Sequence, residues 1–123
     1  MHSGENTCVV SDGGVVELIG EHDITSAPEM SKVLDRAARM SPGSLRVDLT
    51  RTTFIDSSIV AAIVGSAREL TGKGRGVALR VLEGSTAAAV FAIVGLGNQP
   101  GVAVELVPAP EGPDRPTDGG DQV

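Results

Sequence analysis

Two hydroxyls and a carboxylate stand together in Asp56-Ser57-Ser58, where an alternating apolar segment gives way to a segment with helical periodicity. The first N–H groups of a helix lack intrahelical partners, so each of these side chains is a suitable cap. The same groups and the positive end of the helix dipole favour a phosphate on either serine, although Asp56 would repel it. The segment therefore fits a plain helix cap or a reversible phosphorylation site.

Other residues that could do chemistry are few. His22 lies between Glu21 and Asp23, but neighbours on an extended segment point to opposite sides and do not converge on one ion. We therefore expect no metal and interpret His22 as a surface or loop histidine. A hydrolase would need His22 beside a serine, which nothing in the sequence indicates. The glycine-rich turn at 72–76 lacks the spacing of a phosphate-binding loop, so we predict neither an enzyme nor a cofactor.

Hydrophobic periodicity predicts the elements that position these residues. The predicted strands are Thr7–Val10, Val15–Ile19, Leu45–Leu49, Val77–Leu82 and Val102–Val107, with a hairpin turn at 11–14 between the first two. The predicted helices are Ala27–Met40, Ser58–Thr71 and Thr86–Val94. This order, β-β-α-β-α-β-α-β, predicts an α/β fold whose sheet has a large parallel component, because helix-length crossovers join parallel strands.

Signals at two of these helices are specific. Ser26 and Glu29 are spaced as in a capping box, with Pro28 in the first turn, so we expect the Ser26 side chain to cap the first helix. The third helix is expected to face the core through Ala87, Val90, Phe91 and Val94.

Composition narrows the function classes. At 123 residues the chain is long enough to bury a core without metal or disulfide support. The net charge of −6 and the absence of Trp and Tyr argue against nucleic acid as a direct partner. With no signal-peptide pattern and no apolar run of roughly 18 residues, we expect a cytoplasmic protein with no membrane partner. Cys8 lies in an apolar run and is expected to be a buried, inert thiol.

The chain divides into a folded domain, residues 1–107, and a tail, residues 108–123. The tail holds four carboxylates against Arg115, a net charge of −3, and four of the seven prolines. A segment of this composition cannot bury enough apolar surface to order itself, so we predict that it is disordered.

An ordered set of short motifs carries a family resemblance. The motifs are Gly20-Glu21-x-Asp23, Ser26-Ala27-Pro28-Glu29, Val47-Asp48-Leu49, Phe54-Ile55-Asp56-Ser57-Ser58 and Val90-Phe91-x-x-Val94-Gly95-Leu96. In this order and spacing, over about residues 9–107, the chain resembles the bacterial anti-sigma factor antagonists, which share the STAS domain. The resemblance implies a STAS-like mixed sheet with helices mainly on one face.

The resemblance also implies a function in signalling and transcription regulation. The unmodified family member binds an anti-sigma factor that is also a serine kinase, which releases a sigma factor. The kinase uses its own ATP to phosphorylate a serine of the Asp-Ser-Ser/Thr element, and a phosphatase removes the phosphate. By position the acceptor is Ser58, favoured at the helix start, or Ser57. Asp56 would shape the site, Ile59 would meet the partner, and Asp23 is either a partner contact or a turn carboxylate.

The chain departs from the family immediately after these serines. Family members usually continue with Gly-Leu-Gly, whereas this sequence reads Ile59-Val60-Ala61. Ile59 adds a branched side chain where glycine leaves a gap, so the partner needs a matching pocket or a different contact. A second interpretation therefore stays open: a non-phosphorylated STAS adapter or scaffold module, or a small-ligand binder, in which Asp56-Ser57-Ser58 only caps a helix.

Overall fold

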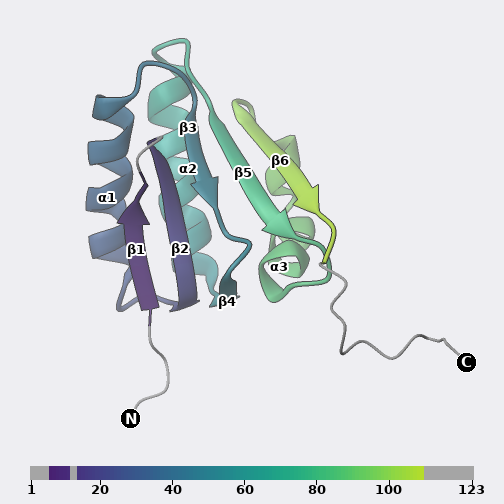
Figure 1. Ribbon diagram of the computed structural model, residues 1–123. Helices are drawn as coiled ribbons and strands as arrows, with labels where there is room; N and C mark the ends of the chain where they lie inside the picture. The colour runs from purple at the N-terminus through teal and green to yellow at the C-terminus, as the bar shows by residue number, and fades with distance from the viewer. Residues whose placement is uncertain (1–5, 12–13, 110–123) are drawn as a thin grey trace, which may run out of the picture.

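Alternating apolar residues build the strands of the computed structural model, which describes residues 6–11 and 14–109. The strands are β1 (Asn6–Val10), β2 (Val15–His22), β3 (Leu45–Asp48), β4 (Thr52–Ile55), β5 (Val77–Leu82) and β6 (Val102–Val107). They form one six-stranded sheet in the order β1-β2-β3-β5-β6, with β4 also paired to β2 (Figure 1). β1 pairs antiparallel with β2 and the other pairs are parallel. Residues 12–13 of the predicted hairpin turn lie outside the described residues.

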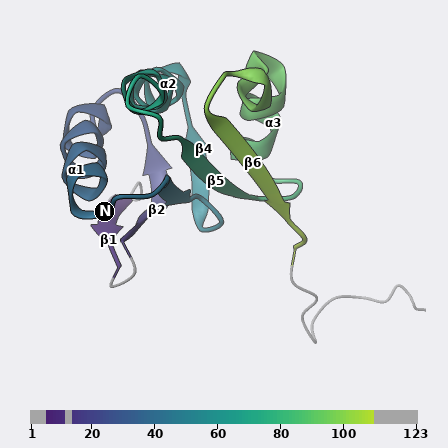
Figure 2. The same cartoon turned by 90° about the horizontal axis from the view of Figure 1, so that it is seen from above.

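Three helices cross between the strands. They are α1 (Ala27–Met40), α2 (Ser57–Thr71) and α3 (Thr86–Val94), and a short 3₁₀ turn, η1 (Leu96–Asn98), precedes β6. All three helices lie on one face of the sheet, and no helix of the described residues covers the other face (Figure 2). The predicted mixed α/β fold with helices on one face is confirmed.

The core lies between the sheet and this helical layer. α2 buries Ile59, Val60, Ile63, Ala67 and Leu70, which recur at helical spacing, and α1 buries Met30, Val33, Leu34 and Ala37. In α3 only Ala87 and Phe91 are buried, whereas Val94 is 45% exposed. The predicted apolar face of α3 therefore meets the core only in part.

β4 is the strand that the sequence did not predict. Its four residues are too few to show an alternating pattern, and its two central side chains are both exposed. It is fixed by pairing with β2, and the Thr52 hydroxyl donates a hydrogen bond to the Leu18 carbonyl at 2.5 Å. The register shifts between Gly20 and Glu21, where Gly20 has a φ of 88°. Glycine adopts this left-handed conformation at little cost, so β2 can continue past the shift.

The start of α1 differs from the predicted capping box. Ser26 has a helical backbone, with φ −98° and ψ −8°, and its side chain makes no cap hydrogen bond. Its hydroxyl instead accepts a hydrogen bond from the Asp23 N–H and contacts the His22 ring, both at 3.1 Å. The capping box is wrong because the hydroxyl is used within the turn, while the proline in the first turn of α1 is confirmed.

The domain boundary remains a prediction. From residue 110 onward the predicted tail lies outside the described residues. Over residues 6–11 and 14–109, no helix is both long enough and apolar enough to cross a membrane.

Candidate functional site

The two aspartates singled out in the sequence leave the sheet side by side. β2 and β4 are parallel neighbours, and His22 at the end of β2 pairs with Ile55 at the end of β4. Asp23 and Asp56 are the next residues along each strand. Because carboxyl ends of parallel strands meet at one edge of a sheet, both aspartates and the start of α2 share that edge.

Asp56 is the N-cap of α2. Its backbone is extended, and its Oδ1 accepts hydrogen bonds from the Ser58 N–H at 3.0 Å and the Ser58 hydroxyl at 2.5 Å. One carboxylate oxygen therefore satisfies a free N–H of the first turn and also holds the hydroxyl of the favoured acceptor.

The two serines differ in their surroundings. Ser57 is exposed, whereas Ser58 is half-buried and bonded to Asp56. One and two turns farther along α2, Ala61 and Gly65 are also exposed, so the outer face of α2 carries small residues from its start to its middle. Both serines lie in the first turn of α2, where the helix dipole favours negative charge.

Ile59 does not share this surface. Its side chain is 0% exposed and packs in the core between α2 and the sheet. Its side chain therefore does not belong with the surface residues of the predicted partner-binding set. The branched side chain that replaces the family's glycine fills this protein's own interior.

Asp23 closes a tight turn between β2 and α1. Its Oδ1 accepts hydrogen bonds from the Thr25 N–H at 2.9 Å and the Thr25 hydroxyl at 2.5 Å. Its carbonyl accepts from the N–H groups of Ser26 and Ala27, both at 3.0 Å. The hydrogen bonds from the hydroxyl and then the N–H of Thr25 hold the pKa of the Asp23 carboxyl below its usual value.

We expect Thr25→Ala to raise the Asp23 pKa toward its usual value, because the hydroxyl is the largest contributor to the shift. A pKa lowered by folding contributes stability above the unfolded-state value, and that stability is lost as the pH falls through the folded-state value. The variant should therefore show a weaker loss of stability on acidification. Titration of the Asp23 carboxyl carbon by NMR measures the pKa, with Thr53→Ala as an exposed control; an unchanged pKa would contradict the assignment.

The Asp-x-Ser/Thr arrangement occurs three times. Asp48 Oδ1 accepts from the Thr50 N–H at 2.8 Å and the Thr50 hydroxyl at 2.6 Å. Asp23 with Thr25 and Asp56 with Ser58 repeat this geometry. In each case an aspartate terminates a strand by bonding the backbone and hydroxyl two residues on. The local geometry at Ser58 is thus a general turn device of this chain.

His22 is buried, which overturns the interpretation as a surface or loop histidine. Its side chain is 1% exposed, and Nε2 lies 3.2 Å from the Thr7 carbonyl and 3.1 Å from the Ile19 carbonyl. Nδ1 lies 3.1 Å from the Ser26 hydroxyl. The ring therefore joins β1, β2 and the start of α1, and both nitrogens are engaged away from Ser57 and Ser58.

Two exposed apolar residues at this edge were missed by the sequence reasoning. Ile24, in the turn after Asp23, is 70% exposed, and Phe54, two residues before Asp56, is 43% exposed. Large apolar side chains that stay in water beside functional groups are typical of contact surfaces. The exposure of Phe54 could have been predicted, because neighbouring residues of a strand point to opposite faces and Ile55 is buried.

A comparison with protein families identifies the family to which this chain belongs. The family described as "Mlab, STAS domain" matches residues 9–108. The chain belongs to the STAS domain family. No curated protein sequence gives a significant match.

Solved structures agree with this STAS fold. One is the anti-sigma factor antagonist SpoIIAA in its unphosphorylated form, at 22% identity and a TM-score of 0.62, covering 87% of this chain and 90% of that chain. Another is a Thermotoga maritima protein assigned as an anti-sigma factor antagonist, at 18% identity and a TM-score of 0.61, covering 81% and 85%. At these identities the likeness concerns the fold.

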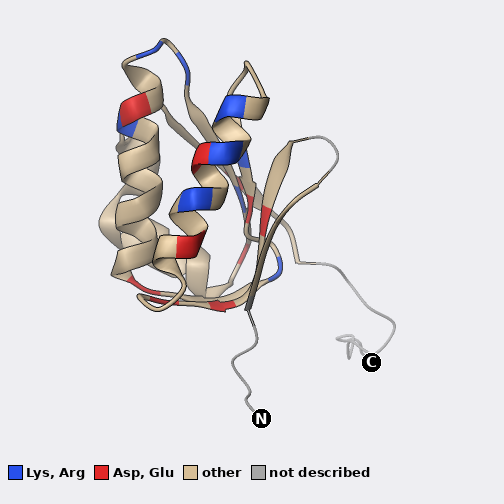
Figure 3. Cartoon of the chain, turned by 90° about the vertical axis from the view of Figure 1, so that its left-hand side faces the viewer, with Lys and Arg blue, Asp and Glu red and all other residues tan. Residues whose placement is uncertain are grey.

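Charge is divided unevenly between the two ends of this STAS domain (Figure 3). Among the described residues, the end that carries Asp56 gathers Glu21, Asp23, Glu29, Asp56 and Glu83 against Arg51. The opposite end, where α1 and α2 finish, gathers Arg36, Arg39, Arg68, Lys73 and Arg75 against Asp35 and Glu69. The candidate surface is therefore acidic around its exposed apolar residues.

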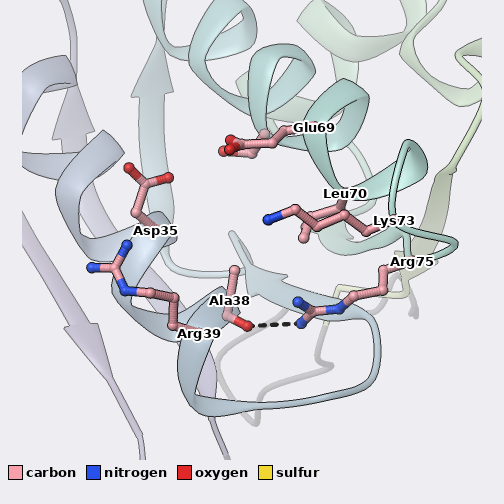
Figure 4. Close-up of a pocket in the computed structure, with 8 residues that line it drawn as sticks. Asp35, Ala38, Arg39, Glu69, Leu70, Lys73 and Arg75 are labelled. Atoms are coloured by element: carbon pink, nitrogen blue, oxygen red, sulfur yellow. Dashed lines mark hydrogen bonds between the residues drawn. The ribbon is translucent and has the colours of Figure 1, made fainter.

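A small cavity of about 130 Å³ lies at the opposite, basic end, between α1 and α2 (Figure 4). Its Arg75 guanidinium is already occupied, donating to the carbonyls of Gly43 at 3.0 Å and Ala38 at 2.8 Å and to that of Ser41. None of the predicted site residues lines this cavity. Arg75 thereby satisfies carbonyls at and beyond the end of α1, which is a structural role.

Residues 6–11 and 14–109 contain neither a cluster of metal ligands nor a thiol with a lowered pKa. No group of three or more His, Cys, Asp and Glu side chains there is arranged to hold a metal ion. Cys8 is half-buried, and burial, with a smaller effect of Glu29, raises the pKa of its thiol to about 11. A thiol with this pKa stays protonated at neutral pH and is unreactive.

Proposed function

We propose that this STAS protein is an anti-sigma factor antagonist. In its unphosphorylated form it binds an anti-sigma factor of the serine kinase type and so releases a sigma factor for transcription. The observation that carries the proposal is the cap of α2: Asp56 accepts hydrogen bonds from Ser58, next to Ser57 in the first helical turn, on the same sheet edge as Asp23. The fold likeness to anti-sigma factor antagonists supports it.

The contact surface in this proposal combines an apolar centre with a carboxylate rim. Ile24 and Phe54 supply apolar area, Asp56 is bonded to Ser58, and Asp23 lies at the same sheet edge. The small side chains of Ala61 and Gly65 let a partner approach the outer face of α2. This is the usual anatomy of a protein interface, with apolar anchors inside a polar boundary.

Phosphorylation of Ser58, or of Ser57, would switch this surface off. A phosphate adds close to two negative charges and a hydration shell. On Ser58 it would also displace the hydroxyl from Asp56 and set two like charges together. An interface that covers Ile24 and Phe54 would have to strip water from that group, which is costly. A phosphatase that removes the phosphate would restore binding.

A second function has an observation in its favour. The Asp56–Ser58 geometry repeats that of Asp48–Thr50 and Asp23–Thr25, which no pattern marks as modification sites. A chain that uses this device as a cap alone would be a non-phosphorylated STAS adapter or scaffold module in a signalling assembly, or a small-ligand binder. It would present the same surface without a switch.

Incubation of the purified protein with the host's anti-sigma factor kinases and ATP separates the two functions. We expect a single phosphate by intact mass, mapped by peptide sequencing to Ser58 or Ser57 and lost in the matching alanine variant. Ser44→Ala, at an exposed serine outside the site, serves as the control. Kinases that are active on another substrate but leave this protein unmodified would favour the adapter.

A further inference from the structure

The outer side of α3 is unusually apolar for a surface helix. Its sequence, Thr86–Val94, contains no charged residue. Only Ala87 and Phe91 are buried, whereas Ile93 is 84% exposed and Val94 is 45% exposed. A helix that is apolar all round is normally covered on all sides. Within the described residues, nothing covers the outer side of α3, where Ile93 and Val94 lie.

The neighbouring strand β6 has a free edge. β6 pairs only with β5 among the described strands, and its sequence, Val102–Val107, carries no lysine or proline. Edge strands that stay alone are usually protected by such residues, by bulges or by a covering element. Leu106, at this edge, is 55% exposed, and an apolar groove of about 260 Å³ runs between β6 and α3.

The direction of the free hydrogen-bonding groups follows from the β5 pairing. The carbonyls of Gly101 and Val107 accept hydrogen bonds from the N–H groups of Val77 and Glu83, at 2.7 Å and 2.8 Å. Alternate residues of a strand direct their backbone groups to opposite sides. Val104, between these two, therefore directs its N–H and C=O outward, as does Leu106.

We infer that β6 and α3 form the interface of a homodimer, in which β6 pairs antiparallel with β6 of a second copy across a two-fold axis. The free N–H and C=O groups along the edge of β6 can be satisfied by pairing with another strand. A second copy supplies a strand with the same spacing of free groups and the same apolar flank. Interfaces that use one patch on both copies are the commonest in homo-oligomers.

The charge pattern of β6 permits this pairing and selects its register. With the axis at Val104, the two Val104 residues face each other through their outward groups, and Leu106 lies opposite Val102 of the second copy. The Val102 N–H already donates to the Gln99 carbonyl at 3.1 Å, so Val102 offers only its carbonyl, which can accept from the Leu106 N–H of the second copy. Glu105, the only charged residue of β6, then lies opposite Ala103 of the second copy, and it already contacts Arg80 at 3.3 Å. An axis at Glu105 would oppose two carboxylates, which is unfavourable. The two α3 helices flank the joined sheet, so their exposed apolar side chains gain cover.

Sedimentation velocity of the full chain across micromolar concentrations tests the inference. We expect a reversible monomer–dimer equilibrium, and Leu106→Lys should raise the dissociation constant by about tenfold or more, because lysine blocks edge pairing. Met40→Lys is the matched control, since Met40 is 65% exposed at the end of α1. Ile93→Lys, at a highly exposed position that the fold does not depend on, is a second interface variant.

Hydrogen exchange locates the contact. The amides of Val104 and Leu106 should become slower to exchange as concentration rises, while exposed amides at the basic end should not change. A monomer at all concentrations would overturn the inference. A dimer that Leu106→Lys and Ile93→Lys both leave unchanged would also overturn it, as would a dimer in which the amides of Val104 and Leu106 gain no protection.

Discussion

Replacing Ser58 with glutamate is expected to weaken binding to the anti-sigma factor kinase by about 100-fold, corresponding to roughly 2.7 kcal/mol. The charge would stand in the first turn of α2 beside Asp56, within the surface that also holds Ile24 and Phe54. A binding partner would have to desolvate it. Isothermal titration calorimetry with the purified kinase measures the change, and Ser58→Ala should bind about as well as the unchanged protein.

The matched control is Ser44→Glu. Ser44 is exposed in the segment between α1 and β3, at the other end of the domain, so the same substitution there should leave affinity unchanged. Thermal unfolding verifies that both glutamate variants fold. If Ser58→Glu folds and binds with full affinity, the phosphorylation switch is contradicted. A modest loss of stability with unchanged binding would support the adapter, in which Ser58 only takes part in capping α2.

Ile59→Ala is expected to lower the free energy of unfolding by about 2–5 kcal/mol, the range for large apolar side chains removed from well-packed cores. Ile59 is 0% exposed and belongs to the core cluster. Urea denaturation measures the effect. Ala61→Ser, two residues on at an exposed position, should change stability by less than about 0.5 kcal/mol.

Ile59→Ala also distinguishes a role of Ile59 in the core from a direct contact with the partner. Because the side chain lies inside, the folded fraction of Ile59→Ala should bind the partner with nearly unchanged affinity. A small stability loss together with strongly reduced binding would instead mean that Ile59 reaches the partner, as the family comparison of the sequence first suggested.

Periodic elements were predictable because their signal is local. α1, with apolar residues on one stripe, has the predicted bounds, as do α3, β5 and β6. α2 begins one residue earlier than predicted, at Ser57, because Asp56 caps it. β4 was not predictable in the same way. Its four residues become a strand through pairing with β2 and the Thr52–Leu18 hydrogen bond, which joins residues far apart in the sequence.

The residues of the candidate site were also predictable only in part. Asp23, Asp56, Ser57 and Ser58 were identified from residue type and motif, and the parallel pairing of β2 with β4 shows why they share one edge. Burial was the weak point. The family resemblance placed Ile59 at the partner surface, whereas helical periodicity places it with Ile63 and Ala67 on the buried side of α2. His22 lies inside, whereas Ile24 and Phe54 lie outside. At a strand end or in a turn, the way a side chain faces depends on register and on neighbouring elements, and such short segments carry no periodic signal for it.

The separation of acidic and basic residues between the two ends of the domain gives its described part a dipole along the strands. In solution, such a dipole experiences a torque in the field of a charged partner before the surfaces touch. Diffusional encounters would then be biased in orientation, with the edge that carries Ser57 and Ser58 turned toward positive potential. Because this bias acts over distances comparable to the Debye length, added salt would randomise the approach without altering a single contact in the final complex.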